Sequence, residues 1–300
     1  MPKALLIISG LAVKSEKSDY QKGFRNITEN IIRYNHAFDF ETRFCLENDV
    51  VTGSINPQKQ NSEHDFEKIK DFYEGATLNS IYNMKSINVC SYKNFPQRYI
   101  STHQMPYQRL KILNEEIDFE AFDTIVYVRP DVHITGPVHL HDHKHNNFTI
   151  YHSYGGGGPF HGADYDYMWI GGPKPFKKFL DLWVSNPLMS DDDSKYMKYM
   201  DKETVERLHE QYGLKPLLYH YPELFDQELT GELKEFIKVE IHCLNCVLEL
   251  EKNDMNFALS FQKFGELALL DSAPNTPEEL MQIYDHHKLD IEPLRRDPTW

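Results

Sequence analysis

The chain has 300 residues, of which 40% are apolar, 13% aromatic and 26% charged. This composition is typical of a globular protein with ample material for a core, and the length predicts one large domain or two small ones. Lys and Arg total 32 against 46 Asp and Glu, which leaves a formal net charge of −14. So acidic a chain excludes a general nucleic-acid binder, which needs a broad basic face, and argues against a peripheral protein of anionic membranes.

The sequence also indicates where the protein resides. No apolar run approaches the ~20 residues of a membrane-spanning helix, and the first ten residues have too short an apolar stretch for a signal peptide. Four cysteines are too few for a disulfide framework. Cys243 and Cys246 form a lone CxxC, more typical of two small core residues one helical turn apart than of half a zinc site. We therefore expect a reduced, cytoplasmic protein.

Apolar periodicity predicts strands and helices in alternation. Residues 3–9 form an almost continuous apolar run, as in a strand covered on both faces. Phe24, Ile27, Ile31 and Tyr34 have the spacing of an amphipathic helix over residues 20–38. Further strands are expected at 40–46, 87–92, 124–128, 132–134 and 148–151. Further helices are expected at 65–73, 99–117, 175–184, 201–213, 223–230 and 277–287, whereas residues 235–270 fit a strand and a helix equally well.

This alternation predicts an α/β fold with a mostly parallel sheet flanked by helices. No repeat or low-complexity linker divides the chain, so we expect a catalytic domain over residues 1–230 and a C-terminal helical extension, residues 231–300, packed on the same domain. In an open α/β sheet, ligands bind beyond the carboxyl ends of the strands. Two segments meet that condition: the loop at 9–17 after the first strand, and Arg129-Pro130-Asp131 after the strand at 124–128.

Residues 122–132, with the sequence FDTIVYVRPDV, resemble the strand and DxD motif of glycosyltransferases of the GT-A fold, in a variant with Arg129 in place of the first aspartate. Further parts of the resemblance follow in order over roughly residues 1–230. They are a helix with Arg109 and Lys111, Asp166 before an aromatic-rich strand, and a Pro-Glu pair that ends in Glu223. The resemblance implies a GT-A-like, Rossmann-like sheet. It also implies an enzyme that transfers a sugar from a nucleotide diphosphate-sugar donor to a hydroxyl of a glycan or another carbohydrate.

The donor diphosphate needs a local counter-charge, because a protein of net charge −14 does not attract it as a whole. The resemblance gives Asp131 as the ligand of Mn²⁺ or Mg²⁺, which would stabilise the leaving nucleotide diphosphate. It also suggests His220 as a further metal ligand from a late loop. Arg129 could contact the phosphates directly, so a strict metal requirement stays open. Asp131-Val132-His133 is a second register, which fits a D-x-H variant.

The other site residues are expected around this centre. In an inverting transferase one carboxylate acts as general base on the acceptor hydroxyl. Asp166 matches the family position for this base, and Asp164 is a second candidate. The donor is expected to contact the end of the first strand, the helix before the R-x-D segment, that segment itself and the late Pro-Glu pair: Ser9, Gly10, Arg109, Lys111, Arg129, Asp131 and Glu223.

These assignments have simpler alternatives. Asp131 and Asp166 also suit residues that close a turn, and His220, which lies between two tyrosines, suits a packed histidine. In residues 139–145 every second residue is His, which on a strand would bring four His to one face, but a solvated loop is favoured. For the whole chain, the alternatives are a sugar nucleotidyltransferase and a carbohydrate-binding protein that kept the fold without turnover.

Overall fold

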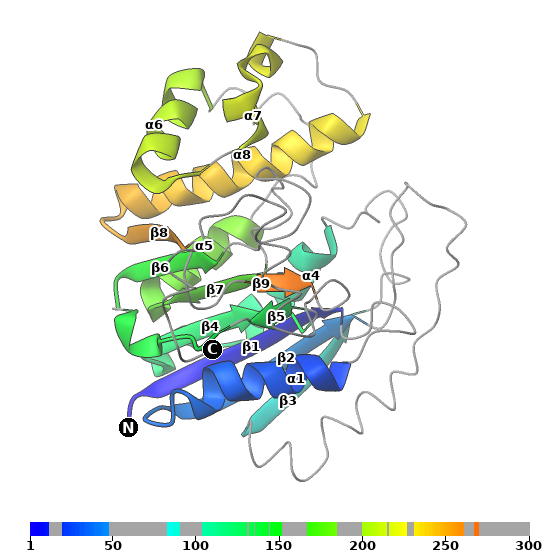
Figure 1. The fold of residues 1–300 in the computed structure, drawn as a ribbon, viewed down its shortest axis with the longest axis vertical. Coiled ribbons are helices and arrows are strands. Elements are labelled where there is room, and N and C mark those ends of the chain that lie inside the picture. Colours follow the sequence, from blue (N-terminus) through cyan, green and yellow to red (C-terminus); the bar gives the residue numbers. More distant parts are fainter. Residues whose placement is uncertain are drawn as a thin grey trace, which may run out of the picture.

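The computed structural model describes residues 1–11, 20–47, 83–90, 104–130, 132–134, 136–143, 145–151, 167–184, 200–214, 216–226, 231–260 and 267–269. In chain order the strands of the main sheet are β1 (Lys3–Leu11), β2 (Asp39–Glu47), β3 (Met84–Cys90), β4 (Thr124–Val128), β6 (Asn147–Tyr151), β7 (Met168–Gly171) and β8 (Asn256–Ser260). The fold is α/β, as expected, with these seven strands in the order β3-β2-β1-β4-β7-β6-β8 (Figure 1). The sheet is mixed and mostly parallel.

The order of the strands reverses around β1. The pairs β1–β2, β1–β4 and β2–β3 are parallel. Strand β7 is antiparallel to both β4 and β6, and β8 is parallel to β6. Because β2 lies on one side of β1 and β4 on the other, the chain builds the sheet outward from β1 in both directions. Such a reversal leaves a crevice at the carboxyl ends of the two strands. This topological switch point lies between β1 and β4.

Helices cover both faces of the sheet. Their bounds are α1 (Tyr20–Ile27), the π-helix η1 (Thr28–Arg33), α4 (Gln104–Glu116), α5 (Pro173–Val184) and α8 (Gly231–Lys252). On one face Ile31 of η1 joins the buried cluster that contains Leu6, and on the other Leu110 of α4 joins the cluster that contains Leu5. Alternate residues of β1 therefore face different cores, as in a strand that is covered on both sides.

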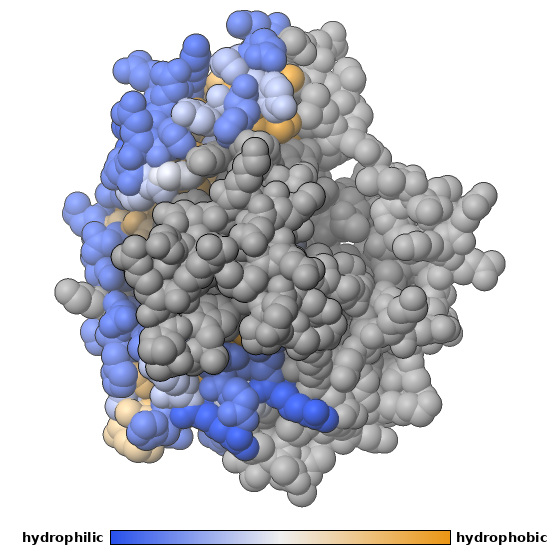
Figure 2. All heavy atoms as spheres, viewed as in Figure 1, coloured by the Kyte–Doolittle hydropathy of each residue, from blue (hydrophilic) through white to orange (hydrophobic). Residues whose placement is uncertain are grey.

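Shorter elements complete the described part of the chain. They are η4 (Phe119–Ala121), β5 (Val132–Ile134), η5 (Leu140–Asp142), α6 (Lys202–Tyr212), α7 (Leu217–His220), η10 (Pro222–Asp226) and β9 (Leu267–Leu269). β5 and β9 form a separate antiparallel pair. Figure 1 places α6, α7 and α8 together beyond β8, at the end of the molecule away from β1. Figure 2 shows hydrophilic residues over α6 and over α1 on the same face of the molecule.

Most predicted elements within the described ranges are confirmed, but two differ. The helix expected over 20–38 is α-helical only to Ile27 and continues as the π-helix η1. Of the helix expected over 223–230, residues 223–226 are described and belong to the 3-10 helix η10, which begins at Pro222; the short α7 before it was not predicted. A proline restricts the residue before it to extended conformations, and Tyr221 separates the two elements with ψ 69°. The helices expected at 65–73 and 277–287 lie outside the described residues.

The ambiguous segment 235–270 contains helix α8 and strands β8 and β9. Residues 256–260 are the seventh strand of the sheet, so this part of the expected C-terminal extension belongs to the sheet itself. The boundary at residue 230 stays a prediction. Cys243 and Cys246 are buried in α8 as free thiols, which confirms their interpretation as core residues. Within the described ranges, no helix combines the length and the apolar character needed to cross a membrane.

Candidate functional site

The switch point brings together two of the segments expected to bind the donor. Ile8 of β1 pairs with Val128 of β4, so Ser9 and Arg129 come next on two neighbouring parallel strands. Ser9 and Gly10 end β1 together with Leu11, and Arg129 and Pro130 follow β4. Both segments therefore lie at the carboxyl edge of the sheet, where open α/β folds bind their ligands.

A buried arginine is fixed to the end of β1. The Nε of Arg109 on α4 donates a hydrogen bond to the Oγ of Ser9 at 3.0 Å. Arg109 is 3% exposed and Ser9 is fully buried. A buried charge is stable only when its polar atoms are hydrogen-bonded or paired, so Ser9 is part of what holds this cation on the α4 side of the sheet. The sequence predicted both residues at the site but not their bond.

The end of β1 and the segment after β4 approach each other closely at Gly10. Its φ of +144° lies in the region that favours glycine. A Cβ at this position would lie 3.2 Å from Cδ of Pro130 and 3.5 Å from Cγ of Arg129. A side chain here would therefore push the end of β1 away from the segment that follows β4.

A second arginine is held at the same edge by Tyr167. The backbone N–H of Arg129 donates to the carbonyl of Tyr167 at 3.0 Å, one residue beyond the pairing of Val128 with Met168. The guanidinium carbon of Arg129 lies 4.7 Å from the centre of the Tyr167 ring, a cation–π contact. Sequence reasoning did not assign Tyr167 to the site. The only available signal was an aromatic residue directly before the strand at 168–171.

Two arginines thus flank Ser9-Gly10: one bonded to Ser9, the other with its side chain against Gly10. Guanidinium groups bind phosphates through paired N–H donors in a fixed plane. Arg129, which is half-buried, can therefore reach an anion at the carboxyl edge of β1 and β4, whereas Arg109 is almost fully buried and adds its charge from the interior.

Other residues predicted for the site lie elsewhere. Lys111 is exposed on α4, and two residues from Arg109 it faces another direction of the helix. His220 ends α7, where its ring lies edge-on to Tyr219 at 5.0 Å, and Glu223 is exposed on η10. Figure 1 places α7 beyond β8, away from the ends of β1 and β4. The structure therefore does not bring His220 and Glu223 to the switch point.

The predicted carboxylates Asp131, Asp164 and Asp166 lie outside the described residues. Among the described ones, no three His, Cys, Asp or Glu side chains gather closely enough to hold a metal ion. The histidines around 139–145 do not form such a group, because residues 140–142 form a 3-10 turn in place of a strand. His143 instead packs inward with its Nε2 2.9 Å from the Tyr151 hydroxyl. A Mn²⁺ or Mg²⁺ ion on Asp131 stays a prediction.

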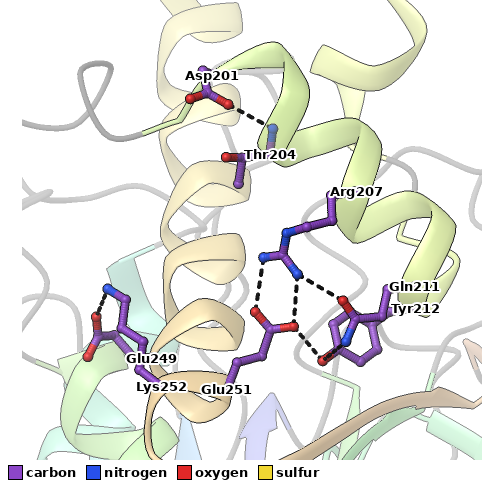
Figure 3. A network of polar contacts seen from close by, with 8 residues as sticks. All are labelled: Asp201, Thr204, Arg207, Gln211, Tyr212, Glu249, Glu251 and Lys252. Atoms are coloured by element: carbon purple, nitrogen blue, oxygen red, sulfur yellow. Dashed lines mark hydrogen bonds and ion pairs between the residues drawn. The ribbon is translucent and has the colours of Figure 1, made fainter.

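A polar network fastens α6 to α8 at the other end of the molecule (Figure 3). Arg207 donates to both carboxylate oxygens of Glu251 at 3.1 and 3.0 Å, and the Tyr212 hydroxyl donates to Glu251 at 2.6 Å. Burial and the bond to Glu251 raise the pKa of Tyr212 to about 12. The helix α6 itself starts at Asp201, whose side chain accepts from the Thr204 N–H at 2.7 Å. The network has the chemistry of a structural joint.

A buried carboxyl group lies where α8 meets α7. Glu240 is 1% exposed, and its Oε2 accepts a hydrogen bond from the N–H of Leu217 at 2.8 Å. Burial raises the pKa of Glu240 to about 8, although the bond from Leu217 acts in the opposite direction. Burial also lowers the pKa of His242, two residues further along α8, to about 4. These groups affect how stability depends on pH.

Comparison with protein-family models gives no match for this chain, and comparison with curated protein sequences gives none either.

Proposed function

We propose that the protein is a glycosyltransferase of GT-A-like fold that transfers a sugar from a nucleotide diphosphate-sugar to a hydroxyl of a glycan or another carbohydrate. The observation that carries the proposal is the pair of arginines, Arg109 and Arg129, on the two sides of Ser9-Gly10 at the topological switch point. This is the place where an α/β sheet of this kind binds a nucleotide. The order of the resembling motifs along the chain supports the same conclusion.

The charge of the protein means that such a reaction needs a local counter-charge, and these arginines supply one. A net charge of −14 repels a diphosphate, so cations fixed at the site must provide the attraction. In the transfer, the bond between the anomeric carbon and the β-phosphate oxygen breaks, and this oxygen keeps the electron pair. A guanidinium that is already oriented, as Tyr167 orients Arg129, stabilises the developing charge without having to reorganise.

The residues proposed to act on the acceptor are inferred from the sequence alone. In an inverting transfer the acceptor oxygen bonds to the anomeric carbon while its proton passes to a carboxylate, for which Asp166 is the first candidate and Asp164 the second. Asp131 would hold Mn²⁺ or Mg²⁺, which supplies further neutralisation of the diphosphate when bound. Arg109 and Arg129 would share this neutralisation with the ion.

The proposal is tested by thermal unfolding with UDP, GDP, CMP and dTDP and their common sugar conjugates, each with Mn²⁺ and with EDTA. One nucleotide class at 100 times its Kd should stabilise the protein by about 2.7 kcal/mol. Arg129→Gln should remove this stabilisation. The control is Arg43→Gln on β2, whose guanidinium pairs with Glu41 at 2.8 Å within the same sheet, and it should retain the stabilisation. The absence of a shift with every nucleotide would overturn the proposal.

Turnover separates the proposal from its alternatives. A transferase hydrolyses its nucleotide-sugar slowly even without acceptor, whereas a carbohydrate-binding protein leaves it intact. A nucleotidyltransferase releases pyrophosphate from a nucleoside triphosphate and a sugar phosphate. Asp131→Ala should abolish transfer and leave thermal unfolding unchanged, and near-normal turnover in this variant would contradict the assignment of Asp131.

A further inference from the structure

Three asparagines of α1 and the segment after it bind the end of β5 and the chain that follows it. The side-chain amide of Asn26 donates to the carbonyl of Ile134 at 2.7 Å and accepts from the N–H of Ile134 at 2.7 Å. Asn35 makes the same two-point contact further along, donating to the carbonyl of Val138 at 2.7 Å and accepting from the N–H of Leu140 at 3.0 Å. Between them, Asn30 donates to the carbonyl of Ile134 at 3.2 Å. Each outer side chain thus pairs with the backbone much as a neighbouring strand would.

The three asparagines lie along one continuous segment of the chain. Asn26 belongs to α1 and Asn30 to the π-helix η1, which begins at Thr28, and the two are four residues apart, close to one turn of an α-helix. Asn35 lies two residues beyond the end of η1 at Arg33, and its backbone N–H donates to the carbonyl of Ile31 at 3.2 Å. Its side-chain amide donates to the same carbonyl at 2.7 Å, which holds the side chain in place beside residues 138–140.

Asn26 connects the helix that follows β1 with the strand that follows β4. The loop after β1 leads into α1, which carries Asn26, and the segment after β4 leads into β5, which ends at Ile134. Within that second segment the N–H of Val132 is 3.4 Å from the carbonyl of Arg129. The segment from Arg129 to Ile134 is therefore held by Tyr167 at its start, and at its end by the pairing of β5 with β9 on one side and by Asn26.

We propose that Asn26 is a positioning residue of the switch-point site, which fixes β5 and through it the place of Arg129 relative to Ser9-Gly10. It touches no ligand itself. Its effect on ligand binding rests on the proposed function, whereas its effect on the backbone does not. Asn35 offers a matched control, because it makes the same kind of contact from the turn that follows η1 but holds residues 138–140, further along the chain from Arg129.

The first test measures amide hydrogen exchange in the protein without ligand. Asn26→Ala should speed exchange over residues 129–134, and Asn35→Ala should speed exchange over residues 136–143 and leave 129–134 unchanged. Unchanged protection of 129–134 in Asn26→Ala would overturn the proposal. If either alanine variant fails to fold, Asn26→Asp, which keeps the acceptor for the Ile134 N–H, and Asn35→Ser give the same comparison.

The second test measures affinity for the nucleotide diphosphate that stabilises the wild-type protein. Asn26→Ala should weaken binding about tenfold through misplacement of the phosphate-binding arginine. Asn35→Ala should bind as the wild type does, although Asn35 is the more deeply buried of the two, at 3% exposed, and its loss should reduce stability more. Equal weakening in both variants would show a merely structural role and overturn the proposal. If the wild type binds no nucleotide, the proposed function fails, and the exchange experiment still decides whether Asn26 fixes the segment.

Discussion

The Nε of Arg109 and the Oγ of Ser9 lie 3.0 Å apart at the end of β1, both on side chains that are almost completely buried. The pair joins a helix to the central strand through a cation. It therefore matters to the stability of the sheet as well as to the charge at its carboxyl edge, and the two contributions can be measured separately.

Ser9→Ala removes the acceptor of the Arg109 Nε–H. A buried donor that loses its partner costs about 1–3 kcal/mol of unfolding free energy. The midpoint of urea denaturation should fall accordingly. Thr42→Val is the matched control on β2. Thr42 is fully buried and its Oγ1 has no hydrogen-bond partner among the described residues, so valine should leave stability unchanged or raise it. Equal losses in the two variants would contradict the importance of the Ser9–Arg109 bond.

Gly10→Ala should affect both stability and binding. The φ of +144° and the 3.2 Å approach to Pro130 Cδ predict a loss of about 1–3 kcal/mol. Because the added methyl group also lies near Arg129, nucleotide affinity should fall. Gly213→Ala is the control: Gly213 ends α6 with φ 73° and should cost about 1–2 kcal/mol, with no change in affinity. Equal nucleotide affinity in Gly10→Ala and the wild type would show that the contact at Gly10 does not position Arg129.

The buried Glu240 contributes stability that is lost as pH rises from about 4.5 to about 8. Its pKa is raised from 4.5 to about 8, so between these values the folded protein holds a proton that the unfolded chain releases. Stability therefore decreases with pH across this interval, by up to about 1.4 kcal/mol per pH unit. Glu240→Gln keeps an acceptor for the Leu217 N–H and removes the titration, so its unfolding free energy should decline less between pH 6.5 and 8.5.

The choice of pH range follows from two histidines. Burial lowers the pKa values of His143 and His242 from 6.5 to about 4. Between pH 4 and 6.5 the unfolded chain binds these protons and the folded protein does not, so stability rises with pH there. Above pH 6.5 both histidines are neutral in both states. Parallel curves for Glu240→Gln and the wild type above pH 6.5 would refute the role of Glu240.

Glu251→Gln tests the joint between α6 and α8. The variant loses a bidentate pair with Arg207 and weakens the bond from Tyr212, so we expect a loss of about 1 kcal/mol that shrinks at high salt. Glu249→Gln is the control, since among the described residues Glu249 forms an ion pair only with Lys252, on the same helix and on an exposed surface. Such a pair contributes about 0.5 kcal/mol or less. Urea denaturation should therefore show a larger loss of unfolding free energy for Glu251→Gln than for Glu249→Gln. Similar losses would show that the network contributes no more to stability than an exposed ion pair does.

Local pattern was sufficient for much of the fold. The strand at 124–128 and the helices around Leu110 and Phe179 follow from apolar spacing alone, and their described bounds lie within a few residues of the prediction. The positions of Ser9 and Arg129 at one edge follow from a general property of α/β sheets. The pattern does not predict the tertiary contacts that the side chains of these residues make. Tyr167 beneath Arg129 is an example.

The π-helix could not be predicted for a related reason. Ile27 and Ile31 have α-helical spacing, and the pattern of apolar residues gives no sign of the change at Thr28. The change is a property of the backbone over residues 28–33. The partners of Asn30 in this π-helix and of Asn35 after it lie about a hundred residues further along the chain, beyond the reach of a local pattern. Similarly, β8 is short and follows a long helix, and only its pairing with β6 identifies it as part of the sheet.

The pairing of β6 with β8 has a consequence for synthesis of the protein. Asn147 and its neighbour Asn256 are 109 residues apart, so β6 emerges from the ribosome long before the strand that covers it. At 5–20 residues per second the delay is roughly 5–20 s. During that time β6 presents an open row of backbone donors and acceptors, which is a template for association between nascent chains. Any shortened form that ends before residue 256 would retain this open edge permanently and should aggregate.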